Sequence, residues 1–127
     1  MFARKYETIV IVNPESGEEG LDRALGRMRE ALESTGGREV RLEDWGVRRL
    51  AYELGKSTKG HYLYMLFLGA NTTVVEMERL LQITEPVLKY QTILLEDRVA
   101  IEAFDFEAAS KELSVMGRQS QRQEVSA

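Results

Sequence analysis

A set of basic residues carries the clearest binding chemistry in this sequence. Arg48 and Arg49 stand side by side in the largely apolar stretch WGVRRLAYEL, residues 45 to 54. Guanidinium groups pair with phosphate or carboxylate through parallel hydrogen bonds. Because consecutive strand residues point to opposite faces, a strand here delivers one guanidinium to each side of a sheet. The other members of the set are Arg4, Lys5, Lys56, Lys59 and Lys89.

Solvated surface charge is the alternative interpretation of the same residues. Lys and Arg on an exposed edge strand deter pairing with a wrong strand, and this is sufficient for Lys56 and Lys59 taken singly. It does not account for two consecutive arginines between apolar neighbours. The net charge of −4 argues against a freestanding nucleic-acid binder, because phosphate backbones favour clustered Lys and Arg. Contact with nucleic acid would therefore use one local face, or the help of a partner.

Catalytic and metal-binding patterns are not found in the sequence. The chain has no cysteine and a single histidine, His61, with no serine or second ligand spaced to join it. The acidic residues of the turns and element ends are explained by solvation and helix N-terminal charge. The glycines form no phosphate-binding loop. We therefore expect no enzyme, no cofactor and no metal. The acidic residues considered are Glu15, Glu18, Glu19, Glu43 and Asp44.

The elements that must position the basic residues follow from periodicity. Apolar residues recur at helical spacing from Leu21 to Leu32, and Gly36-Gly37 ends that helix. Thr73 and Glu76 fit a capping box that opens a second helix. The expected elements are strands over residues 4–12, 38–54, 61–68 and 87–95 and helices over residues 18–35 and 73–86, with a hairpin turn over residues 55–60.

This order predicts a ferredoxin-like α+β sandwich, in which two helices cover one face of a four-stranded antiparallel sheet of order 4-1-3-2. The first and third strands are apolar on both faces and belong at the centre, whereas residues 38–54 are the most polar strand and belong at an edge. Gly46 is a candidate bulge position, at which the two faces of that strand would exchange. The sheet face away from the helices carries more apolar surface than a monomer usually exposes.

The fold alone leaves several functions open. An acylphosphatase-like enzyme needs a basic anion loop after the first strand, but residues 13–20, NPESGEEG, are acidic. A small-molecule regulatory domain is a second alternative. Single-strand RNA recognition by aromatic stacking would use Tyr6, Tyr62 and Tyr64, although their apolar neighbours favour core tyrosines.

Composition predicts one domain over residues 1–106 and a flexible tail over residues 107–127, which is rich in Ser and Gln. The tail is a candidate segment for ordering on a partner. No stretch approaches the roughly 18 apolar residues of a membrane-spanning helix. The absence of cysteine fits a cytoplasmic protein.

Several separated motifs resemble the bacterial small-subunit ribosomal protein six family. The run GVRRLAYEL from Gly46 to Leu54 matches its signature, and the resemblance covers about residues 2 to 98. Leu54 and Gly55 depart from the family's isoleucine and frequent polar residue. The signature positions are Lys5, Tyr6, Glu7, Gly46, Arg48, Arg49, Leu50, Ala51 and Tyr52.

The resemblance implies a non-enzymatic ferredoxin-like protein of the cytoplasmic ribosome. Such a protein binds the central domain of small-subunit ribosomal RNA together with ribosomal protein eighteen, with no membrane and no small-molecule substrate. The arginines of the signature are the first candidates for contacts to RNA or partner, and the other basic residues named above are weaker ones. Leu50 and Tyr52 are expected to pack in the sheet.

Overall fold

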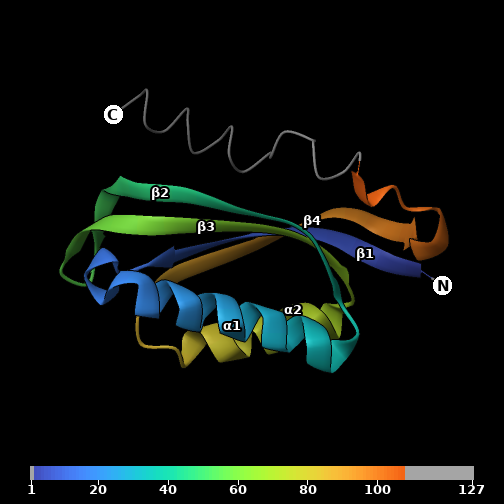
Figure 1. Cartoon of the computed structure of the whole chain (residues 1–127), viewed down its shortest axis with the longest axis horizontal. Helices are drawn as coiled ribbons and strands as arrows, with labels where there is room; N and C mark the ends of the chain where they lie inside the picture. Colours follow the sequence, from blue (N-terminus) through green and yellow to red (C-terminus); the bar gives the residue numbers. More distant parts are fainter. Residues whose placement is uncertain (1, 108–127) are drawn as a thin grey trace.

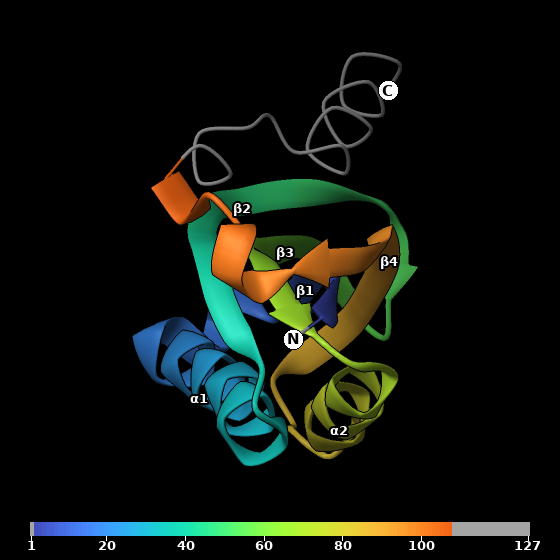
Figure 2. The ribbon, with the colours of Figure 1, turned by 90° about the vertical axis from the view of Figure 1, so that its right-hand side faces the viewer.

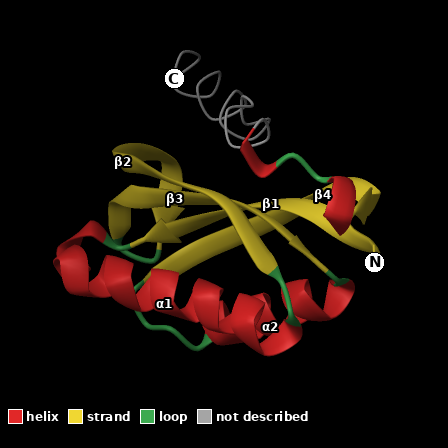
Figure 3. Ribbon diagram, turned by 45° about the vertical axis from the view of Figure 1, so that its right-hand side comes forward, coloured by secondary structure: helices red, strands yellow, loops and turns green. Residues whose placement is uncertain are grey.

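The computed structural model describes residues 2–107 of the chain (Figure 1). The sheet has the order β2-β3-β1-β4 with antiparallel pairing throughout, which confirms the expected ferredoxin-like sandwich. Both helices lie side by side on one face of the sheet (Figure 3). The elements are β1 (Phe2–Val12), η1 (Pro14–Ser16), α1 (Gly17–Thr35), β2 (Arg38–Leu54), β3 (Ser57–Gly69), α2 (Asn71–Gln82), β4 (Val87–Ala100) and η2 (Ile101–Ala103).

Helix α1 forms as its periodicity predicts. Its apolar stripe faces the sheet and buries Met28 and Leu32. The helix ends at Gly36, which adopts a φ of 75° and donates its N–H to the Leu32 carbonyl. Only glycine adopts this left-handed conformation without a steric penalty, so the Gly36-Gly37 stop has a physical cause.

The start of α2 differs from the expected capping box. The helix begins at Asn71, ahead of Thr73, and the Thr73 hydroxyl accepts the N–H of Ala70 at 3.1 Å. Glu76 instead pairs with Arg79 one turn later. Thr73 is therefore a buried capping residue inside the first turn, and the helix ends at Gln82, well before Pro86.

Several strand boundaries also differ from expectation, and β1 begins at Phe2 instead of residue 4. Strand β4 continues to Ala100, because it remains paired with β1 as far as Phe2. Strand β3 begins at Ser57, which leaves a tight turn at Gly55-Lys56. The placement of Lys59 in the turn was wrong, since Lys59 lies in β3 opposite Arg49.

A bulge in β2 confirms the prediction made for Gly46. Asp44 pairs with Leu63 and Gly46 pairs with Tyr62, so Trp45 is the extra residue. Gly46 has a φ of 76°, and the Asp44 carboxylate accepts its N–H at 2.8 Å. An extra residue reverses the alternation of side chains, so the faces of β2 exchange at this point.

The core lies in two layers. The larger layer fills the space between sheet and helices and includes Val10, Phe67 and Met77. The smaller one lies on the opposite face, which we call the open face, where Tyr64 and Leu66 are buried beneath Trp45 and Phe104. Strand β2 arches over this face (Figure 2), and the segment after β4 packs on it. The large apolar surface expected there is thus partly covered by the chain itself.

Candidate functional site

Exposed cations gather at the β2–β3 hairpin. Arg49 and Lys59 are directly opposite each other in the ladder, and Lys56 lies in the turn that joins the strands. All three side chains are exposed, and within residues 2–107 none of them has an ion-pair partner. Like charges placed opposite each other across a ladder are destabilising. This group, called the hairpin cluster below, therefore presents three exposed cations that have no ion-pair partner among the described residues.

Arg48 lies on the other face of β2 from Arg49. After the bulge, Arg48 and its partner Gly60 belong to the open face, whereas Arg49 and Lys59 share the helix side of the sheet. The Arg48 guanidinium lies 5.2 Å from the Trp45 ring centre and 5.5 Å from that of Tyr62. These distances are within the range of cation–π attraction. The two adjacent arginines thus serve two faces, and only Arg49 belongs to the hairpin cluster.

An aromatic stack continues from Arg48 along the open face. Trp45 stacks on Tyr64 with ring centres 5.1 Å apart, and the Arg41 guanidinium lies 5.1 Å from the Tyr64 ring centre. Glu43 accepts the indole N–H of Trp45 at 2.8 Å. Tyr64 is fully buried, so most of this stack is structural. Its accessible end is at Arg48, where stacking or charge can meet a ligand.

Lys89 belongs to the same end of the sheet. It lies opposite Ile11, which is also opposite Tyr62 of β3. The Lys89 ammonium donates to the Tyr52 hydroxyl at 2.7 Å. Tyr52 is 61% exposed, so the expectation that it packs in the sheet was wrong. The reason is that β2 leaves its regular pairing between Arg49 and Leu54 and curls over the open face. Leu50 is half-buried, as expected.

Arg4 and Lys5 lie at the opposite end of the sheet. Their partners in β3 are Gly69 and Leu68, far from the hairpin turn. Arg4 pairs with Asp97 at 2.9 Å. Lys5 is only 6% exposed, and its ammonium lies 2.8 Å from a Glu96 oxygen. The structure thus separates these two candidates from the others and places Lys5 in the interior.

His61 pairs with a carboxylate beside the bulge. Its Nε2 lies 2.5 Å from Asp44 Oδ1, the oxygen that also accepts the Gly46 N–H. Partial burial opposes the charge of Asp44, but the bonds from Gly46 and His61 prevail and lower its pKa below the ordinary 3.8. Sequence reasoning gave His61 no role. Its position opposite Val47, two residues past the bulge residue Trp45, explains it as a structural residue.

The arrangement is suited to binding a polyanion. Within residues 2–107 no group of His, Cys, Asp or Glu side chains is placed to hold a metal ion. No helix in that part of the chain is long and apolar enough to cross a membrane. In complexes with nucleic acids, exposed cations contact phosphates, and aromatic rings beside them stack on bases. Fold and site together define a ferredoxin-like binding protein that presents a basic hairpin.

The family model for ribosomal protein S6 matches residues 5–94. The chain therefore belongs to the ribosomal protein S6 family, whose members are structural proteins of the small ribosomal subunit and not enzymes.

Curated relatives agree with this assignment. Small ribosomal subunit protein bS6 of Desulforapulum autotrophicum is 41% identical over 85% of this chain and 72% of its own. The protein of the same name from Geobacter sulfurreducens is 44% identical over 79% of this chain and 86% of its own. The crystal structure of 30S ribosomal protein S6 from Thermotoga maritima is 24% identical and covers 94% of this chain and 98% of its own, with a TM-score of 0.67. This last similarity supports the fold.

Proposed function

We propose that this protein binds the central domain of small-subunit ribosomal RNA together with ribosomal protein eighteen, and that the hairpin cluster contacts the RNA. The observation that carries the proposal is the direct opposition of Arg49 and Lys59. Two exposed cations held against each other cost stability within the chain. A phosphate placed between them would convert that repulsion into two attractions.

A protein partner explains how an acidic chain can serve this function. The net charge is −4, so the field of the whole molecule does not attract RNA. Binding to RNA depends on the number of phosphates that are neutralised. Protein eighteen would supply most of that charge, and the hairpin cluster would add a local contact with Arg48 and Lys89 beside it. In this proposal the protein works on the ribosome, in the cytoplasm.

Arg4 and Lys5 do not enter the proposed contact surface. Lys5 is buried and its ammonium pairs with the half-exposed Glu96, so it would have to leave both its site and its partner to reach a ligand. We assign Lys5 to the fold. Arg4 stays outside the surface because it lies at the other end of β1.

The test is the double variant Arg49→Ala with Lys59→Ala. It should weaken binding of the heterodimer to a central-domain RNA fragment. The slope of log affinity against log salt is negative, and its magnitude should fall by about 1 for each phosphate that is no longer neutralised. The free energy of unfolding should stay the same or rise slightly, because a repulsion is removed. Binding titrations at several salt concentrations and urea unfolding measure both quantities.

The matched control is Arg23→Ala with Arg27→Ala on α1. It removes the same charge from cations that pair with Glu19 and Glu30 instead of facing each other. It should leave the salt slope unchanged. An equal loss of affinity in both variants would mean that the effect comes from net charge and not from the hairpin. An unchanged salt slope in the hairpin variant would contradict the proposed RNA contact.

A further inference from the structure

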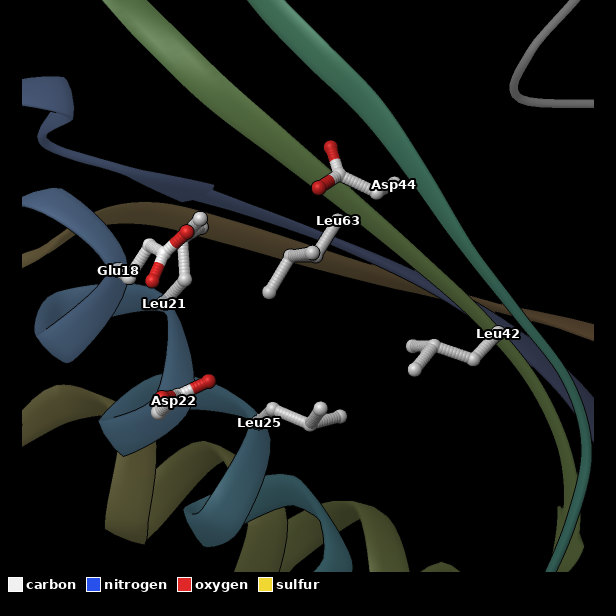
Figure 4. Close-up of a pocket in the computed structure, with 7 residues that line it drawn as sticks. All are labelled: Glu18, Leu21, Asp22, Leu25, Leu42, Asp44 and Leu63. Atoms are coloured by element: carbon white, nitrogen blue, oxygen red, sulfur yellow. The ribbon is translucent and has the colours of Figure 1, made fainter.

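A shallow apolar groove lies between α1 and the edge of the sheet (Figure 4). Leu21 and Leu25 line it from α1, Leu42 from β2 and Leu63 from β3. The groove has a volume of about 410 Å³. Three of these leucines are half-buried, so apolar surface on the helix side of the sheet stays in contact with water. Covering such surface is favourable at roughly 25 cal/mol per Å².

Carboxylates form the rim of this groove. Glu18 and Asp22 approach it from α1, and Asp44 approaches it from β2. Glu18 and Asp22 have no cationic partner within residues 2–107, whereas Glu19 and Glu30 of the same helix pair with neighbouring arginines. Asp44 is held in place by Gly46 and His61. The rim is therefore negative.

The charge of the rim decides which partner fits. Three carboxylates around an apolar floor repel phosphate, so this groove is not a second RNA contact. A basic segment with large aliphatic side chains matches both features, because leucine-sized groups fill the floor while Lys or Arg meets the rim. Helices offer such side chains at i, i+3, i+4 and i+7.

We propose that this groove docks an amphipathic helical segment of a basic partner protein. The position of the groove gives the segment an orientation. Along β2, the acidic rim residue Asp44 is followed after the bulge by Val47 and then by Arg49 of the hairpin cluster. The basic side of the partner helix lies toward α1 and away from that cluster. This proposal does not depend on RNA binding by the hairpin.

The probe for the test is a synthetic peptide of about 18 residues, with leucines at helical spacing and lysines elsewhere. A second peptide replaces the leucines by serine at the same charge. We expect the full-length chain to bind the first peptide and not the second. Methyl resonances of Leu21, Leu25, Leu42 and Leu63 should shift, while the single tryptophan, Trp45 on the open face, keeps its fluorescence.

Charge-neutral variants test the rim without removing packing. Glu18→Gln with Asp22→Asn should weaken peptide binding by about three- to tenfold, the effect of two exposed ion pairs. The control is Glu33→Gln with Glu85→Gln, which removes two exposed carboxylates outside the groove and should leave affinity near that of the unaltered chain. Equal affinity in the two variants, or equal binding of the serine peptide, would overturn the proposal.

Other occupants would leave different signatures. If sedimentation shows dimers whose formation shifts the same methyl resonances, the groove belongs to a second copy of this chain. If removal of residues 108–127 shifts them, the groove belongs to the chain's own tail. Either result replaces the proposed partner helix.

Discussion

Single residues set the geometry of the edge strand. The Asp44 carboxylate accepts the bulge N–H of Gly46 and lies against His61, so it fixes the bulge that sets the faces of β2 beyond Trp45. Without the bulge, Arg48 and Arg49 would occupy each other's faces. The faces on which Arg48 and Arg49 lie thus depend on the bulge at Gly46, to which neither arginine contributes.

The pH dependence of stability tests the role of Asp44. Its pKa is lower in the folded chain than in the unfolded one. The stabilisation is therefore present above the ordinary value of 3.8 and is lost as pH falls through the folded value. Asp44→Asn keeps an oxygen for the Gly46 N–H but loses the charge. Its deficit in the free energy of unfolding should be clear near neutral pH and should shrink below pH 3.8.

Urea unfolding at a series of pH values measures this deficit. Asp22→Asn removes an exposed carboxylate at the groove rim, and it serves as the control for net charge. A deficit for Asp44→Asn that does not change with pH would mean that the carboxylate contributes by shape alone.

At the scale of the elements, the β2–β3 hairpin depends on close packing at one glycine. Gly60 is buried on the open face, where a Cβ atom would lie 2.3 Å from Ile11 Cγ2 and 3.1 Å from Leu50 Cδ2. The Ile11 methyl belongs to a β-branched side chain with little rotamer freedom, so it cannot move aside easily. Gly60 is therefore required for Leu50 to lie over β1 as β2 curls across the sheet.

Gly60→Ala should destabilise the fold by about 1 to 3 kcal/mol, the cost of overpacking a core. Gly26→Ala is the matched control, because a Cβ there meets nothing within 4 Å. In the middle of a helix this change should stabilise by roughly 0.5 to 1 kcal/mol. Equilibrium unfolding in urea distinguishes them. Equal stability of the two variants would mean that the hairpin adjusts without cost.

Local patterns predicted the elements, their order and the bulge, because periodicity and glycine positions act over a few residues. They did not predict the side-chain positions that follow from the curl of β2 over the open face. Tyr52 does not pack in the sheet, and its hydroxyl accepts a hydrogen bond from Lys89. Lys59 lies in β3 and not in the turn. Burial of Lys5 was also missed, because its partner Glu96 is distant in the sequence. The candidate cations can be identified in the sequence, but their positions in space depend on the tertiary structure.

At the scale of the whole molecule, a basic and an acidic surface lie near the same end of the sheet (Figure 1). The hairpin cluster is basic and exposed, whereas the N-terminal half of α1 carries Glu18, Glu19 and Asp22. Such a molecule can face RNA with one surface and a basic protein with a neighbouring one without a favourable net charge. The division into a domain over residues 1–106 and a tail that orders on a partner stays a prediction, because the tail lies almost wholly outside the described residues.

RNA binding by the assembled pair tests the central proposal most directly. Purified chain is titrated onto a central-domain RNA fragment, with and without ribosomal protein eighteen, across a range of salt concentrations. The proposal predicts tight binding only when both proteins are present, with affinity that falls steeply as salt rises. Equal affinity with and without protein eighteen, or an affinity that does not change with salt concentration, would contradict the proposal.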